Sequence, residues 1–125
     1  MADFLHDDVL DGGLDVLTAD VSDLYICSAM PATYAEASST YALGTKATPT
    51  VGAAGAGDPD GREVEVSAIT DGSVTGTDDA AYWALVDDTP TERLLAAGAL
   101  SAPQAVTSGN TFTLTAFTVR FPDPA

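Results

Sequence analysis

The chain has 125 residues, of which 19 are acidic, four are basic and one is histidine, so its formal net charge at pH 7 is −15. Such an anionic field argues against direct binding to nucleic acid or to an anionic membrane surface, because both attract Lys and Arg side chains. A hydrophobic content of 46% with 18% charged residues is typical of a globular protein. We expect an acidic arm at 1–21, followed by one β-domain at 22–125.

The first 20 residues predict a short helix. Its apolar side chains follow the i, i+4, i+7, i+11 spacing of one helical stripe, at Leu10, Leu14, Leu17 and Val21. Aspartates at every fourth position repel one another, and Gly12-Gly13 interrupts the pattern. We therefore expect a helix that is ordered only when docked, either on its own domain or on a neighbouring subunit. The stretch 1–8 lacks the basic start and apolar run of a signal peptide, which predicts synthesis and retention in a cytoplasm.

Strand-forming residues at 23–28 predict a β-strand that contains Cys27, the only cysteine. A lone cysteine in a strand usually behaves as a small buried hydrophobic residue. The stretch 30–49, dominated by Ala, Ser and Thr, predicts an extended loop with little strand content. The glycine-rich stretch 52–61 predicts a flexible loop.

The second half of the chain has the periodicity of β-structure. Residues 62–68 alternate, which predicts a strand with Val64, Val66 and Ala68 facing inward. Asp71-Gly72 predicts a tight hairpin turn, because type I′ turns favour this dipeptide. Residues 80–86 are apolar on both faces and predict a central strand. The run 94–100 favours a strand paired with 80–86 over a helix.

The last predicted strand, 111–121, follows a turn at 108–110 and changes its phase. Its first apolar set is Phe112, Leu114 and Ala116, and its second set, of opposite parity, is Phe117, Val119 and Phe121. A regular strand cannot keep both sets on one face, so either a bulge lies near Ala116-Phe117 or the strand passes from one sheet to another. Together these patterns predict a mainly β fold, an antiparallel β-sandwich or partly open β-barrel with a short N-terminal helical arm.

The sequence offers no convincing catalytic or metal site. His6 is the only histidine and lies in the acidic arm, where no nucleophile is placed to use it. Asp58-Pro59-Asp60-Gly61 is similar to the start of a calcium loop, but Arg62 and Ile69 stand where that loop requires oxygen ligands. We therefore expect a protein that is not an enzyme and has no cofactor and no ordered metal.

Several stretches carry a resemblance to a known family. They are Leu10 to Leu14, Ser67 to Thr77, Trp83 to Asp87, Leu94 to Ser101 and Ala105 to Leu114. These stretches are similar to small virion-associated proteins encoded by tailed bacteriophages and prophages of marine and other alphaproteobacteria. The likeness spans most of the chain, and its motifs are turns and strands. It implies a structural protein of a phage particle and transfers no active-site residue.

From this resemblance we expect a virion structural protein, foremost a head decoration (cement) protein on the outer capsid surface. Such a protein is made in the host bacterial cytoplasm and stabilises the shell through subunit contacts. Its expected partners are the major capsid protein and symmetry-related copies of itself, as a trimer or another homo-oligomer. The predicted contact residues are the apolar side chains of the arm: Phe4, Leu5, Val9, Leu10, Leu14 and Leu17.

Two alternatives are left open by the sequence. One is a neck or tail protein present in few copies. The other is a host-surface recognition module that binds carbohydrate or Ca²⁺. That module needs an exposed Tyr82 or Trp83 as a stacking platform, or an ion at Asp58 and Asp60, whereas a lone Trp in an apolar strand is typical of a core.

Overall fold

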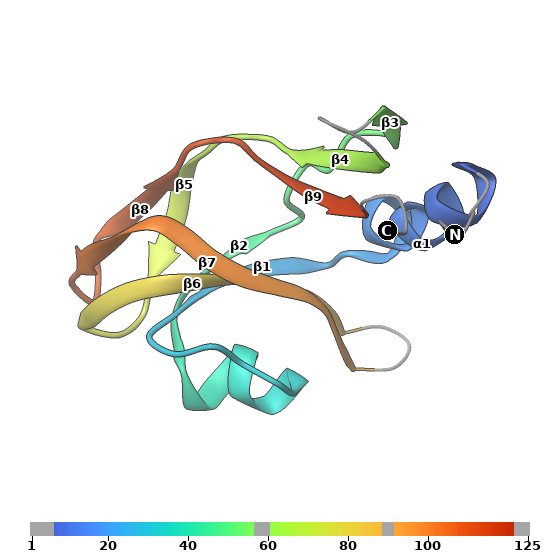
Figure 1. Cartoon of the computed structure of the whole chain (residues 1–125). Coiled ribbons are helices and arrows are strands. Elements are labelled where there is room, and N and C mark those ends of the chain that lie inside the picture. The colour runs from blue at the N-terminus through green and yellow to red at the C-terminus, as the bar shows by residue number, and fades with distance from the viewer. Residues whose placement is uncertain (1–6, 57–60, 89–91, 122–125) are drawn as a thin grey trace, which may run out of the picture. The chain divides into compact units, whose positions relative to one another are not determined.

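Antiparallel strands and one short helix near the N-terminus make up the described chain, which confirms the predicted mainly β fold class. The computed structural model, drawn in Figure 1, describes residues 7–56, 61–88 and 92–121. The predicted boundary near residue 21 is one point at which the chain passes between two compact units. The residues 50–68 and 115–121, which we expected in the β-domain, group with the N-terminal helix instead.

The first unit packs helix α1 on a small sheet. Its elements are α1 (Asp7–Asp20), β3 (Gly55–Ala56), β4 (Arg62–Val66) and β9 (Phe117–Phe121), with the antiparallel strand order β3-β4-β9. The helix contacts β4, and the buried residues include Leu14 and Leu17 on α1 and Val64 and Val66 on β4. The helix therefore docks on its own chain, which was one of the two predicted options.

Helix α1 runs without a break through Gly12-Gly13, so the expected interruption there is wrong. Each glycine costs a helix about 1 kcal/mol relative to alanine. Full burial of a leucine side chain contributes roughly 1.5–3 kcal/mol. The two buried leucines, Leu14 and Leu17, therefore offset the two glycines, and tertiary packing overrides the local propensity.

The second unit is one six-stranded antiparallel sheet with the strand order β7-β6-β1-β2-β5-β8. Its strands are β1 (Asp23–Cys27), β2 (Ala42–Ala47), β5 (Ile69–Val74), β6 (Asp78–Asp87), β7 (Arg93–Val106) and β8 (Thr111–Leu114). β6 lies between β1 and β7, which confirms the predicted central strand at 80–86 and its pairing with 94–100. The predicted loop at 30–49 is wrong in part, because β2 lies within it and pairs with both β1 and β5.

The two edge strands of this sheet, β7 and β8, come together without forming a backbone ladder. The amide Nε2 of Gln104 on β7 donates a hydrogen bond to the carbonyl oxygen of Thr113 on β8, at 3.0 Å. The sheet is therefore curled and not a closed barrel within the described residues.

A five-residue π-helix, η1 (Glu36–Thr40), connects β1 to β2 and covers one face of the sheet (Figure 1). The buried residues of this layer are Cys27, Ala37, Ala84 and Val86, and four half-buried tyrosines pack against them. Cys27 is fully buried, as predicted, and its thiol donates to the carbonyl oxygen of Ala37 at 3.6 Å.

Asp71-Gly72 is not a turn, so the predicted hairpin there is wrong. Both residues lie inside β5, which pairs with β2 on one side and with β8 on the other. A Cβ atom on Gly72 would clash with the ring of Phe112, its direct partner on β8. The glycine at position 72 thus leaves space for the ring of Phe112 and does not form a turn. The predicted turn at 108–110 is confirmed, and Gly109 there has a φ of 92°.

The phase change in the last predicted strand marks a change of sheet. Residues 111–114 form β8 and pair with β5 in the six-stranded sheet, whereas residues 117–121 form β9 and pair with β4 in the three-stranded sheet. Of the two explanations that the sequence left open, the passage from one sheet to another is the one observed. The predicted loop at 52–61 contains the two-residue strand β3, so its purely irregular character is also corrected.

Candidate interaction surface

The strand β7 is the longest strand of the described chain, with 14 residues, and it lies at an edge of the six-stranded sheet. Only its β6 side takes part in a ladder within the described residues. The N–H and C=O groups on the other side of an edge strand are a template for pairing with another chain. Among the described elements, β7 therefore has the backbone geometry expected of a contact surface.

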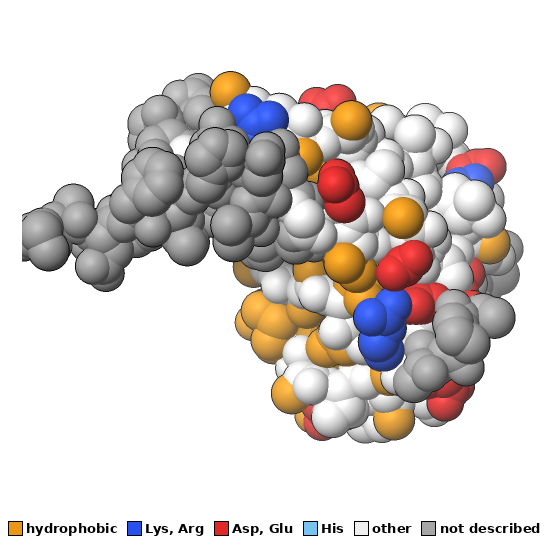
Figure 2. Space-filling view, turned by 90° about the vertical axis from the view of Figure 1, so that its right-hand side faces the viewer, with side chains coloured by type: hydrophobic (Ala, Val, Ile, Leu, Met, Phe, Trp, Pro, Cys, Tyr) orange, Lys and Arg blue, Asp and Glu red, His pale blue; other side chains and the backbone are white. Residues whose placement is uncertain are grey.

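No charged residue occurs between 94 and 119, a stretch that contains β8 and all of β7 except its first residue, Arg93. All 19 acidic residues lie elsewhere. The residues from Leu94 to Gly98 are half-buried, and Ala99 is exposed. On the side of the molecule drawn in Figure 2, some hydrophobic side chains gather at the lower left, and others are scattered among acidic and uncharged ones. Natural edge strands are usually protected by charges, so an uncharged edge in so acidic a protein is unusual.

The indole of Trp83 lies over Gly98, its direct partner on β7. A Cβ atom on Gly98 would be 2.8 Å from Cζ2 of Trp83, closer than real contacts allow. Trp83 is half-buried, so the predicted core placement holds only in part. Tyr82 is also half-buried and packs against the layer under η1. Neither side chain presents a fully exposed ring of the kind that a sugar-stacking platform uses.

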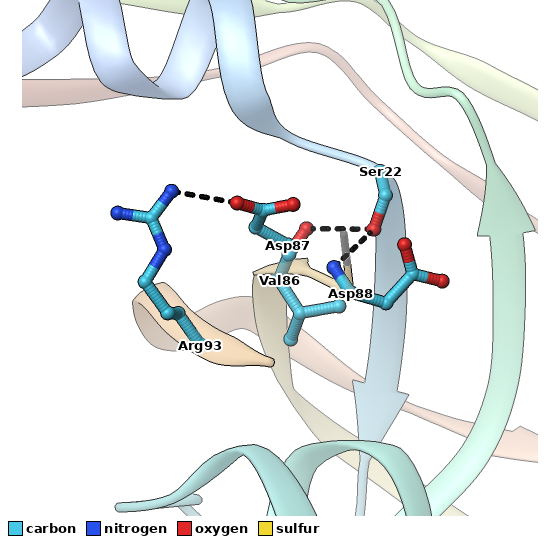
Figure 3. A network of polar contacts seen from close by, with 5 residues as sticks. All are labelled: Ser22, Val86, Asp87, Asp88 and Arg93. Carbon is cyan, nitrogen blue, oxygen red and sulfur yellow. Dashed lines mark hydrogen bonds and ion pairs between the residues drawn. The ribbon is translucent and has the colours of Figure 1, made fainter. Parts of the chain in front are cut away.

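The base of the β6–β7 hairpin is fixed by an ion pair. Nη2 of Arg93 lies 2.6 Å from Oδ2 of Asp87, and these two residues are direct cross-strand partners (Figure 3). The Asp87 side chain is 3% exposed, whereas that of Arg93 is 44% exposed. A buried carboxylate needs such partners, because an unsatisfied charge in the interior costs several kcal/mol. The pair thus holds the first residue of β7 in register.

Ser22 joins this hairpin to the start of β1. Its hydroxyl lies 3.2 Å from the carbonyl oxygen of Val86 and accepts a hydrogen bond from the Asp88 N–H at 3.1 Å (Figure 3). The hydroxyl also lies 3.2 Å from Oδ2 of Asp23, so its one proton is shared between two acceptors. Burial raises the pKa of Asp23, the hydrogen bond from Ser22 opposes that effect, and the nearby Asp88 adds to it.

Two register shifts and a proline limit the segment of β7 whose free edge could pair with another strand. The ladder with β6 shifts register between Leu85 and Val86 and again between Ala80 and Tyr82. Between these shifts β7 pairs regularly, from Ala96 to Ala99. Farther along, Pro103 has no backbone N–H to donate, and proline at an edge blocks pairing with a further strand. The open segment of β7 therefore ends before Pro103.

The predicted contact residues of the N-terminal arm have different outcomes. Leu14 and Leu17 are 0% and 5% exposed and belong to the core of the first unit. Val9 and Leu10 lie on α1. Phe4 and Leu5 lie outside the described residues, as do His6, Asp58 and Asp60. The described ones belong to the first unit, whereas β7 belongs to the second. The lack of charge from 94 to 119 is the signal in the sequence that was missed and that could have pointed to the β7 edge.

The remaining reactive groups are held in their neutral forms. Burial raises the pKa of the Cys27 thiol to about 11, which makes the thiol a poor nucleophile at neutral pH. Burial also raises the pKa of the Tyr25 hydroxyl, with Asp23 adding to the effect. In the described part of the chain, no three His, Cys, Asp or Glu side chains are grouped so that they could hold a metal ion.

No helix among the described residues is both long and apolar enough to cross a membrane. No protein family, no curated protein and no solved structure matches this chain significantly.

Proposed function

We propose that the chain is a non-enzymatic structural protein of a tailed-bacteriophage particle, and specifically a decoration protein on the outer surface of the head. The resemblance of its turns and strands to small virion-associated proteins supports the setting. The observation that carries the proposal is the long edge strand β7, which has no charged residue after Arg93, in a chain of net charge −15. A protein that coats a particle must touch neighbouring subunits without being repelled by them, and an uncharged strand provides such a contact.

The partners in this proposal are the major capsid protein and symmetry-related copies of the chain. The acidic surface suits the outside of a shell, because it repels the DNA packed inside. In the arm, Phe4 and Leu5 are the proposed shell contacts that precede α1. Leu14 and Leu17 stabilise the first unit, so their contribution to attachment is to hold the helix in place.

Copy number in purified particles tests the location. Quantitative mass spectrometry, referenced to the major capsid protein, is expected to give a copy number of the same order as that of the capsid protein. A handful of copies per particle would move the protein to the neck or tail, where the same contacts serve a ring. Absence from particles would overturn the virion role.

A double variant of the arm tests the mode of attachment. Phe4→Ser with Leu5→Ser leaves the buried leucines of α1 unchanged, so the first unit is expected to stay folded. We expect the occupancy of capsids to fall sharply while the melting temperature is unchanged. Thr18→Ser, on the exposed side of α1, is the matched control and keeps full occupancy. Full occupancy of the double variant would show that the arm is not the anchor.

A further inference from the structure

We propose that two copies of the chain pair in an antiparallel manner along the free edges of their β7 strands, about a twofold axis near Gly98. The inference goes beyond the proposed role on a particle and does not depend on it, because it concerns the purified protein alone. It starts from the position of β7 at the edge of the six-stranded sheet, where no described strand pairs with its outer side. An antiparallel partner strand satisfies the N–H and C=O groups of such an edge along its whole length.

The charge distribution identifies the partner as a second copy. A strongly basic partner would be attracted by the acidic surface and would gain no electrostatic attraction on β7, because residues 94–106 carry no charge. An acidic partner is repelled by a chain of net charge −15 unless the contact is free of charge. When the β7 strands of two copies pair, both sides of the contact are free of charge, as this requirement demands. A self-complementary contact of this kind closes with twofold symmetry.

The sequence of β7 also suits an axis at Gly98. The open segment starts after Arg93, whose guanidinium is engaged with Asp87, and ends before Pro103. Gly98 is the midpoint of 94–102, and its neighbours Ala96, Ala97 and Ala99 are small. A register centred on Gly98 sets Ala96 opposite Leu100 of the partner subunit, so that a large side chain meets a small one. Small residues at the centre let two strands approach to normal ladder spacing.

Trp83 provides a signal for this contact. It is the only tryptophan of the chain and lies over Gly98, one strand away from the proposed axis. Because Trp83 is half-buried, a partner strand at the edge changes its exposure to water. Its fluorescence emission is therefore expected to shift with protein concentration.

The decisive experiment is sedimentation equilibrium of the full chain over a range of concentration and salt. We expect a monomer–dimer equilibrium that strengthens as NaCl rises from about 0.05 M to about 0.5 M, because salt screens the repulsion between two acidic copies. Association that weakens with salt would mean an ion-paired contact and would overturn the proposal. A monomer at all salt concentrations up to about 1 mM protein, or a trimer, would also overturn it.

Two lysine variants on β7, one inside and one outside the open segment, test where the two copies contact each other. Ala99→Lys adds a charge in the open segment and is expected to raise the dissociation constant by about tenfold or more. Ala105→Lys adds the same charge to β7 beyond Pro103 and is expected to leave the constant unchanged. Both residues are exposed, so both variants are expected to keep the wild-type melting temperature of the monomer. Equal weakening by the two variants would exclude the segment 94–102 as the contact.

Hydrogen exchange separates strand pairing from contact between sheet faces. In an antiparallel pair every second N–H of a strand points to its partner. We therefore expect concentration-dependent protection within 94–102, at alternate residues from Ala96 to Ala99 where β7 is regular, in parallel with the Trp83 signal. Protection elsewhere in the chain, with none in this segment, would contradict pairing through β7.

Discussion

Two aromatic side chains in the second unit lie on glycines of a neighbouring strand, yet only one of them is enclosed. Phe112 on β8 is 2% exposed and covers both Gly72 and Gly44, on two successive strands. Trp83 on β6 is half-buried and covers only Gly98 on the edge strand β7. An aromatic ring over a glycine replaces the packing that the missing side chain cannot give.

The difference shows which of the two aromatic rings is enclosed and which is open to water, although both lie at or beside an edge strand. Around Phe112, the ring is buried against Gly44 on β2 and Gly72 on β5. Around Trp83 the sheet ends at β7, and water reaches the ring. A ring over a glycine therefore stabilises the core at Phe112, whereas at Trp83 it lies beside an edge strand that a partner can reach.

The largest effect is expected from removal of the enclosed ring. Phe112→Ala deletes a buried aromatic side chain and exposes the space above two glycines, so we expect a loss of about 3–5 kcal/mol in the free energy of unfolding. Urea denaturation measures it. The exposed neighbour provides the control, because Thr113→Ala is expected to change stability by less than about 0.5 kcal/mol. A loss below about 1 kcal/mol for Phe112→Ala would mean that the interior around it is not packed.

The two glycines give the next largest contrast. Gly72→Ala forces a methyl group against the buried ring of Phe112, with an expected cost of about 1–3 kcal/mol. Gly98→Ala meets a ring that can move toward the open edge, so its expected cost is smaller than that of Gly72→Ala. Thermal unfolding compares them. In a Phe112→Ala background the cost of Gly72→Ala is expected to shrink, since the two residues are in contact.

A third glycine serves as the control for this pair. Gly12 on α1 is exposed, and a Cβ atom added to it would meet nothing within 4 Å. Gly12→Ala is therefore expected to stabilise the protein, by up to about 1 kcal/mol, through helix propensity. If Gly98→Ala proves as costly as Gly72→Ala, the edge region is as rigid as the interior and the comparison fails.

The periodicity of the chain predicted the strands whose side chains alternate or are buried on both faces. β4, β6 and β7 follow from it, and the opposite parities of Phe112 and Phe117 predicted either a bulge or a change of sheet, of which the change of sheet is observed. These features are local, because the alternation of apolar and polar residues within a strand determines which of its side chains face inward. The prediction of contact residues in the arm did not anticipate that two of them, Leu14 and Leu17, are core residues of the first unit.

The errors arose where a distant residue decides the structure. Asp71-Gly72 has the composition of a turn, but the ring of Phe112, far along the chain, makes the glycine part of a strand. β2 is poor in strand formers and is held by its two neighbours. One local signal was missed. Thr33 accepts a hydrogen bond from the Glu36 N–H, and the Glu36 carboxylate accepts one from the Ala32 N–H, which is similar to a capping box at a helix start.

A smaller effect tests how the open region is held. Arg93→Met removes a partner of the buried Asp87 carboxylate at the start of β7, with an expected loss of about 1–2 kcal/mol. Lys46→Met breaks the pair with Asp71, in which the side chains are 29% and 67% exposed. That control is expected to cost less than about 1 kcal/mol. Chemical denaturation of both variants under the same conditions measures the difference, and equal losses would mean that the ion pair does not fix the hairpin.

The smallest expected effect concerns the pH dependence at Asp23, beside the same hairpin. Burial raises its pKa in the folded protein, so the folded state holds the proton more tightly than the unfolded state does. Ionisation of Asp23 therefore lowers the stability of the folded state as pH rises from the usual value of 3.8 through the raised pKa. Asn at this position keeps an oxygen acceptor for the Ser22 hydroxyl and does not ionise.

Asp23→Asn is accordingly expected to be more stable than the wild type at neutral pH, by about 0.5 kcal/mol. This advantage is expected to vanish at pH values below 3.8, where the wild-type carboxyl is protonated in both states. Asp15→Asn, on the exposed side of α1, removes the same charge and reports the general relief of a net charge of −15. Thermal unfolding from acidic to neutral pH separates the two variants. Equal stabilisation by both would assign the effect to net charge, and a larger gain for Asp23→Asn would locate it in the half-buried carboxylate of Asp23, beside the β7 hairpin.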